Sequence, residues 1–130
     1  MGTLADCGAA LKTALQTISG LHVDWLWPDT ILPPHVVITP GSRARETFDS
    51  QGVRTFTIYL LGAAAQDGTY RGQANCLPYM EESGASSIRA ALEATASYDV
   101  STSEWHNFDA LRTWQNRTFW GAICEAEVLD

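Results

Sequence analysis

The stretch VRTFTIYLLGA, residues 53–63, is the strongest strand pattern in the chain and decides its fold class. One set of alternate residues is apolar and consists of Phe56, Ile58 and Leu60. The other set mixes apolar and polar residues, namely Val53, Thr55, Thr57, Tyr59 and Leu61. Because successive side chains of a strand point to opposite faces, both faces of this strand carry apolar groups. A strand that is apolar on both faces is typical of the middle of a sheet. The stretch therefore predicts a central strand.

The residues before this strand predict one helix and two further strands. Apolar residues at helical spacing predict a helix over 4–19 with one buried stripe, and Gly20 supplies its left-handed end. The segment LHVDWLWP alternates as a strand that Pro28 ends, with Leu21, Val23, Trp25 and Trp27 on one face. HVVITP predicts a short strand that is entered after Pro34 and stopped at Pro40.

The residues after the central strand predict a pair of helices followed by strands. Residues 64–84 hold a helical stretch with Tyr70, Ala74 and Leu77 on one face, where Pro78 predicts a kink or a late start. SSIRAALEATA predicts a second helix, capped by Ser86 or the residue before it, with Ile88, Ala91, Leu92 and Thr95 inside. YDVSTSEWHNF alternates as a strand through Glu104, and RTFWGAICEAEVLD alternates as the last strand.

This order of elements predicts an α+β fold. We expect a mixed, mostly antiparallel sheet, with the N-terminal helix and the central helix pair packed on one face. At 130 residues with 45% apolar composition, the chain fits a single globular domain over 1–130. The first 20 residues lack a basic region and a long apolar run, so they predict neither a signal peptide nor a membrane span.

The charged and reactive residues predict no catalytic, cofactor or metal site. None of His22, His35 and His106 stands at helical spacing from another candidate ligand. The three cysteines lie far apart without a CxxC pair, which favours reduced, partly buried thiols. The net charge of −7 disfavours a basic footprint on nucleic acid. Adjacent Glu81 and Glu82 do not share a helix face, and no nucleophile elbow surrounds Ser86.

Three groups of residues are candidates for contacts. GSRARETFDSQG, residues 41–52, is either a mobile surface hairpin or a contact with a neighbouring subunit, made by Arg43, Arg45, Glu46 and Phe48. In the last strand Glu125 and Glu127 share one face, which is either solvated or lines an interface. Sheet and core packing explain most of the five tryptophans, and we expect at least one at an interface.

The order of segments resembles the tail terminator proteins of long-tailed bacteriophages, especially those of actinobacterial hosts. The resemblance begins with LADCGAALKTALQTISGLHVDWLWPDTILPPHVVITPG, residues 4–41. It continues through TFTIYLLGA, the Q…LPYM helix and SGASSIRAALEA, and it closes with FWGAICEAEVL, residues 119–129. It covers nearly the whole chain, but its motifs consist of pattern and order rather than a catalytic signature. The tryptophan-rich segments WLW and SEWHNFDALRTWQNRTFW depart from it.

The resemblance implies a structural protein of the virion without enzymatic activity or cofactor. Such proteins form a ring, usually a homohexamer, on the head-proximal end of the tail tube. The ring stops polymerisation of the major tail tube protein and joins the tail to the head-closure protein of the neck. Assembly takes place in the host cytoplasm, without a membrane, and DNA passes through the lumen without specific binding. We expect a net acidic lumen wall, with Glu125 and Glu127 as candidates.

Two other classes of protein remain as alternatives. One is another neck component, such as a head-closure or head–tail connector protein. The other is a small ligand-binding or enzymatic domain whose site assembles from scattered residues. A ring would favour the two neck proteins, whereas a monomer with a deep polar pocket would favour the third class.

Overall fold

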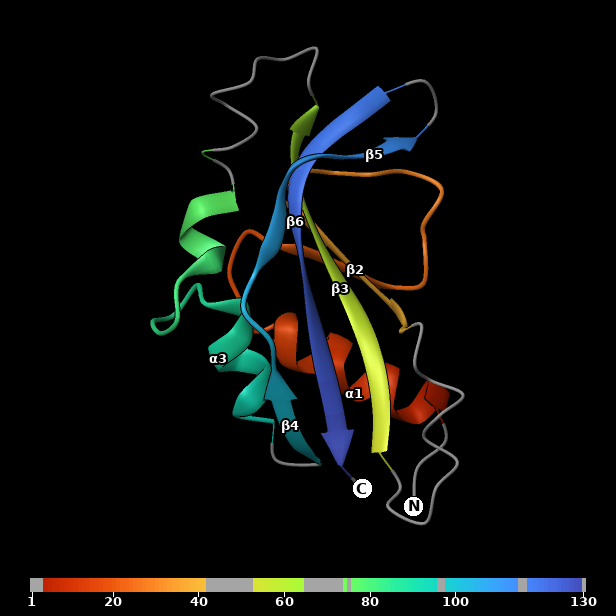
Figure 1. Cartoon of the computed structure of the whole chain (residues 1–130), viewed down its shortest axis with the longest axis vertical. Coiled ribbons are helices and arrows are strands. Elements are labelled where there is room, and N and C mark those ends of the chain that lie inside the picture. Colours follow the sequence, from red (N-terminus) through yellow and green to blue (C-terminus); the bar gives the residue numbers. More distant parts are fainter. Residues whose placement is uncertain are drawn as a thin grey trace.

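The computed structural model describes residues 4–41, 53–64, 74, 76–95, 98–114 and 117–129. Its strands form one mixed sheet in the order β1-β2-β3-β6-β4, with β5 also paired to β6. The strands are β1 (His22–Trp25), β2 (His35–Pro40), β3 (Val53–Ala64), β4 (Asp99–Thr102), β5 (His106–Trp114) and β6 (Arg117–Leu129). The helices are α1 (Leu4–Leu15), the 3-10 helix η3 (Leu77–Met80) and α3 (Ile88–Glu93). The predicted α+β fold is confirmed (Figure 1).

Strand β3 lies in the middle of the sheet, as its sequence predicts. It pairs antiparallel with β2 on one side and with β6 on the other. The pair of β1 and β2 is parallel, while β4 and β5 are both antiparallel to β6. Both faces of β3 are used, because Phe56, Ile58 and Leu60 belong to one buried cluster and Leu61 to another.

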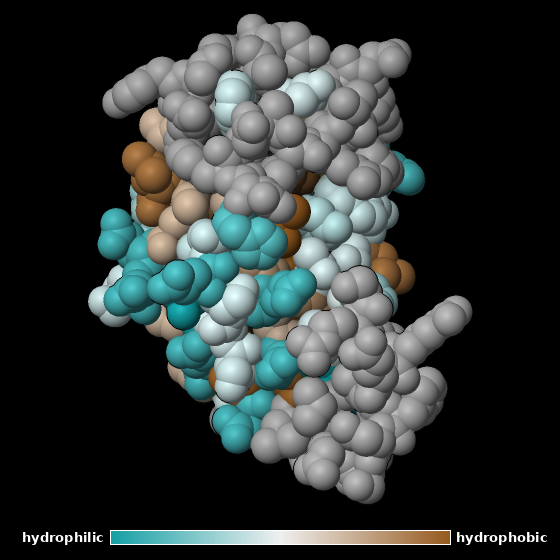
Figure 2. Space-filling model, in the orientation of Figure 1, coloured by the Kyte–Doolittle hydropathy of each residue, from teal (hydrophilic) through white to brown (hydrophobic). Residues whose placement is uncertain are grey.

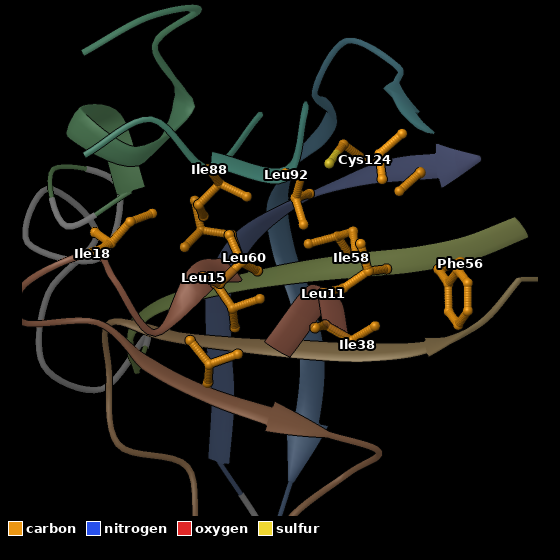
Figure 3. Close-up of a cluster of buried hydrophobic side chains, with 14 of the residues drawn as sticks. Leu11, Leu15, Ile18, Ile38, Phe56, Ile58, Leu60, Ile88, Leu92 and Cys124 are labelled. Atoms are coloured by element: carbon orange, nitrogen blue, oxygen red, sulfur yellow. The ribbon is translucent and has the colours of Figure 1, made fainter. Parts of the chain in front are cut away.

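Helix α1 covers one face of the sheet, and strands β3 and β6 pass in front of it in Figure 1. Cys7, Leu11 and Leu15 form its fully buried stripe, and Figure 3 shows Leu11 and Leu15 among the residues of the strands. The helix ends four residues earlier than its periodicity predicts, and Gly20 follows with the expected positive φ of 78°. At Gly8 a Cβ atom would lie 2.5 Å from the Trp25 ring, so the missing side chain lets this ring rest on the helix.

Trp27 does not share a face with Val23 and Trp25, so that part of the strand prediction is wrong. Leu26, between the two tryptophans, has a φ of 70°, and this left-handed residue breaks the alternation of the strand. The Trp27 ring therefore packs 5.0 Å from the Tyr59 ring on the opposite face. The cluster there consists of Ile31, Val37, Leu61 and Phe119.

Helix α3 begins one residue later than the sequence predicts, while Ala74 and Cys76, just before η3, are already helical. Pro78 lies in the first turn of the 3-10 helix η3, where its missing N–H does no harm. The Leu77 side chain lies at the surface, where it is 54% exposed, while the preceding Cys76 is buried. Helix α3 is capped by Ser87 rather than by Ser86 or Ala85, because the Ser87 hydroxyl accepts a hydrogen bond from Ala90 N at 3.1 Å.

The C-terminal strands contain one more element than predicted. Strand β4 ends at Thr102 instead of continuing to Glu104, and β5 follows as a separate strand. Both pair with the same side of β6, first along residues 126–129 and then along 117–123. The alternation of β6 is confirmed, because Cys124, Ala126 and Val128 are buried in the cluster beneath the helices and Ala122, which alternates with them, is also buried.

Candidate functional site

The face of the sheet opposite α1 is the strongest candidate for a working surface. Toward the C-terminal end of β6, this face carries hydroxyl and carboxylate side chains from strands β2, β3, β4 and β6. We call this group of residues the threonine–glutamate face; it consists of Thr39, Thr57, Ser101, Glu125 and Glu127. Register places these residues side by side, in the row Thr39–Thr57–Glu125 and in the pair Glu127–Ser101. Figure 2 views this side of the molecule, and the described residues over the middle of the strands are mostly hydrophilic or neutral.

A shallow pocket lies on this face between β4 and β6. Its volume is about 210 Å³, and it is lined by Ser101, Thr102, Ser103, Glu125 and Glu127. Ser103 shapes it, because its hydroxyl accepts from Glu125 N at 2.9 Å and donates to Glu104 O at 3.1 Å. A side-chain oxygen thus takes the place of a backbone acceptor where β4 passes into β5. The pocket offers mainly acceptors, which suit water or a positively charged group.

Helix α3 fixes the far side of this pocket through Thr102. The Glu93 carboxylate accepts from Thr102 N at 3.1 Å and from the Thr102 hydroxyl at 2.6 Å. The Arg89 guanidinium donates to the same hydroxyl at 3.1 Å. These charge-assisted bonds tie the helix to the edge of β4 and leave the two glutamates of β6 outside the network.

A second polar group is a pair of side chains between β1 and β2, the buried His35 and the partly exposed Asp24. His35 is 2% exposed, and its Nε2 donates to Asp24 Oδ2 at 2.8 Å. Its Nδ1 accepts from Leu32 N at 2.9 Å, so the ring is neutral with the proton on Nε2. Burial lowers the pKa of His35, while the hydrogen bond to Asp24 opposes this effect. The pair anchors the loop between the two strands.

The His35 pair predicts a loss of stability in mild acid. A lowered pKa in the folded state means that the unfolded chain binds more protons, so its contribution holds above about pH 6.5 and falls below it. We expect urea midpoints to drop between pH 7.5 and 5.5. His35→Phe should lose about 1–3 kcal/mol at pH 7.5, because it leaves Leu32 N and Asp24 without their partner. The variant should also show a smaller drop with pH, and an unchanged drop would refute this role.

The predicted site residues are only partly brought together. Glu125 and Glu127 share a face, as predicted, and both line the pocket. Arg43, Arg45, Glu46 and Phe48 lie outside the described residues. Sequence reasoning missed the contributions of Ser101 and Ser103, although the alternation of YDVSTSEW already placed these serines together on one face.

Other chemistry is scarce in the part of the chain that the structure describes. Cys7, Cys76 and Cys124 are buried free thiols, and burial raises the pKa of Cys76 and Cys124 to about 12. Such thiols are poor nucleophiles.

No three His, Cys, Asp or Glu side chains among the described residues gather closely enough to hold a metal ion. None of the described helices has the length and apolar character that a membrane crossing requires.

Comparison of the sequence with protein-family models finds no match, and comparison with curated proteins finds none either.

Proposed function

We propose that this chain is the tail terminator of a long-tailed bacteriophage. In this role it forms a ring of six copies on the head-proximal end of the tail tube. The ring stops growth of the tube and joins the tail to the head-closure protein of the virion neck. The proposal rests on the resemblance of the segment order, from residues 4–41 to residues 119–129, and on an α+β fold of the kind expected.

The threonine–glutamate face is the structural feature that most strongly supports the proposal. It is a hydrophilic sheet surface opposite α1, and its charged members, Glu125 and Glu127, are acidic. A ring of six chains carries a net charge of about −42, from six times −7. A basic bore would hold DNA phosphates and slow their passage, whereas an acidic bore lets DNA slide. We therefore assign this face to the lumen wall.

The remaining contacts follow from the same proposal. The major tail tube protein binds one side of the ring and the head-closure protein binds the other. Arg43, Arg45, Glu46 and Phe48 remain the candidates for contact with a neighbouring copy or an adjoining ring.

The pocket between β4 and β6 does not favour a ligand-binding domain. Its volume of about 210 Å³ lies below the roughly 300–1,000 Å³ usual for small-molecule sites.

A tube-capping assay tests the proposed function. The purified chain is added to polymerising tail tube protein of the same virus, and the products are viewed by negative-stain electron microscopy. We expect short tubes of limited length with an extra ring at one end. Tubes that grow unchanged, together with a neck reconstruction that lacks a ring of this chain, would refute the proposal. A ring that binds the portal side instead of the tube would assign the chain to another neck component.

A further inference from the structure

The sheet has two edges, and the strands at each edge have a partner on one side only among the described strands. At one end β1 pairs with β2 alone, and at the other end β4 and β5 pair with β6 alone. Unpaired edges of this kind bind other strands unless a helix, a loop, a bulge or charged side chains protect them. The two edges of this sheet differ in this protection.

No described strand pairs with the outer edge of β1. His22 N donates to Pro34 O at 3.1 Å, and Leu26 N donates to Ile38 O at 2.8 Å. Because the inward bonds of a strand alternate along its length, the even-numbered residues of β1 face β2. The backbone groups of Val23 and Trp25 therefore face away from the sheet.

The opposite edge is protected along β4 by helix α3, whereas β5 carries two irregularities in its pairing with β6, between His106 and Asp109 and between Ala110 and Arg112. Thr102 N would point outward from β4, and it already donates to the Glu93 carboxylate at 3.1 Å. A second strand cannot use that donor without displacing α3. Strand β5 covers nine residues, from His106 to Trp114, and is the longer edge at this end of the sheet.

The strand directions make the two edges complementary. Strand β1 runs parallel to β2, and each further step from β2 to β3, β6 and β5 reverses the direction. Strands β1 and β5 therefore run in opposite directions. A neighbouring copy that continues the sheet in the same orientation brings its β1 antiparallel to β5, which is the more stable pairing.

Register also places complementary side chains at the same level of the two edges. One row crosses the whole sheet through Asp24, Val37, Tyr59, Ile123 and His106. Asp24 is 38% exposed, and His35 orients it through Oδ2 alone. The His106 side chain is exposed at the other end of the row. When copies join edge to edge without a shift, this imidazole and this carboxylate meet across the join.

We propose that copies of this chain assemble head to tail, with β1 of one copy antiparallel to β5 of the next and Asp24 paired with His106. This inference rests on the proposed ring and assigns its subunit interface. A head-to-tail contact uses two different surfaces, so it generates a ring when the rotation closes. The join extends the sheet from one copy to the next and keeps the threonine–glutamate faces on one side.

Cross-linking with cysteines tests the interface. The variant with both His22→Cys and His106→Cys places one thiol at each edge, on diagonal positions about 7–8 Å apart across the join. A bismaleimide of about this span is added to rings on tail tubes. We expect a ladder of products up to the complete ring on denaturing gels. Each single variant and the unchanged chain should stay monomeric, because the native cysteines are buried.

The outcomes separate this proposal from the proposed function. Rings that cap tubes but give no ladder would overturn the edge pairing and leave the function standing. A ladder from the chain in solution, together with tubes that grow unchanged and a neck without this ring, would support the pairing and refute the function. Dimers from the single His22→Cys variant would show that identical edges meet, which contradicts the head-to-tail contact. Absence of any oligomer, on tubes or in solution, would overturn both.

Charge at the same position gives an independent test. His106→Asp places a carboxylate against Asp24, and we expect ring formation on tubes to need about fivefold more protein, since one cross-strand pair contributes up to about 1 kcal/mol. The matched variant His106→Asn is neutral and should change the requirement much less. Equal effects of the two variants would contradict the pairing of Asp24 with His106.

Discussion

Replacing Phe56 with alanine should lower the free energy of unfolding by about 3–5 kcal/mol. The Phe56 side chain is fully buried on the central strand, and its ring packs edge to face with the Trp25 ring at a centroid distance of 5.7 Å. Figure 3 shows it at one end of the row that Ile58 and Leu60 continue. Removing the ring leaves a cavity between α1 and the sheet that the strands on both sides of β3 cannot close.

Urea unfolding followed by circular dichroism measures this effect. Leu77→Ala is the matched control, because Leu77 is 54% exposed and its truncation should change stability by about 0.5 kcal/mol or less. A domain of this kind has about 5–15 kcal/mol of stability in total, so Phe56→Ala should shift the midpoint strongly. A loss below about 1 kcal/mol would show that Phe56 is not the centre of the core.

Reversing both glutamates of the threonine–glutamate face should make the ring retain DNA. Glu125→Lys together with Glu127→Lys changes the charge by +4 per chain and by +24 in six copies, from six times four. Each lysine that meets a phosphate releases counterions, so retention should be strong at about 50 mM salt and much weaker at about 200 mM. The unchanged ring should let DNA migrate freely in an electrophoretic mobility assay.

The control for this prediction is a second reversal of the same size. Glu81→Lys together with Glu82→Lys adds the same charge on exposed residues that follow η3, away from the threonine–glutamate face. If the face lines the lumen, this control should bind DNA weakly and should not slow DNA ejection from assembled particles. Equal retention by the two variants would remove Glu125 and Glu127 from the lumen wall.

The features that repeat along the sequence could be predicted from it. The apolar alternation of residues 53–63 predicted a central strand, and Leu11 and Leu15 at helical spacing predicted the buried stripe of α1. The alternation of β6 also placed Glu125 and Glu127 on one face. These predictions succeed because burial depends on a period that many residues share, so that no single residue decides them.

Features that depend on one residue or on distant contacts could not be predicted in the same way. Nothing in the local sequence shows that Leu26 adopts a positive φ, which moves Trp27 to the other face. Strand β5 lacks a clean alternation, and its existence depends on pairing with β6. Ser86 and Ser87 are equivalent caps by residue type, and only the geometry of the turn selects Ser87.

The pairing of β3 with β6 has a consequence for how the chain folds. Strand β3 ends at Ala64 and β6 begins at Arg117, so 52 residues separate the two strands that form the centre of the sheet. Helix α1 and strands β1 to β3 come from the first 64 residues, whereas β4, β5 and β6 follow one another near the other end. Contacts between such distant segments slow folding, to about milliseconds to seconds in sheet proteins. During synthesis on the ribosome, the long apolar strand β3 therefore lacks its β6 partner until residues 117–129 have emerged.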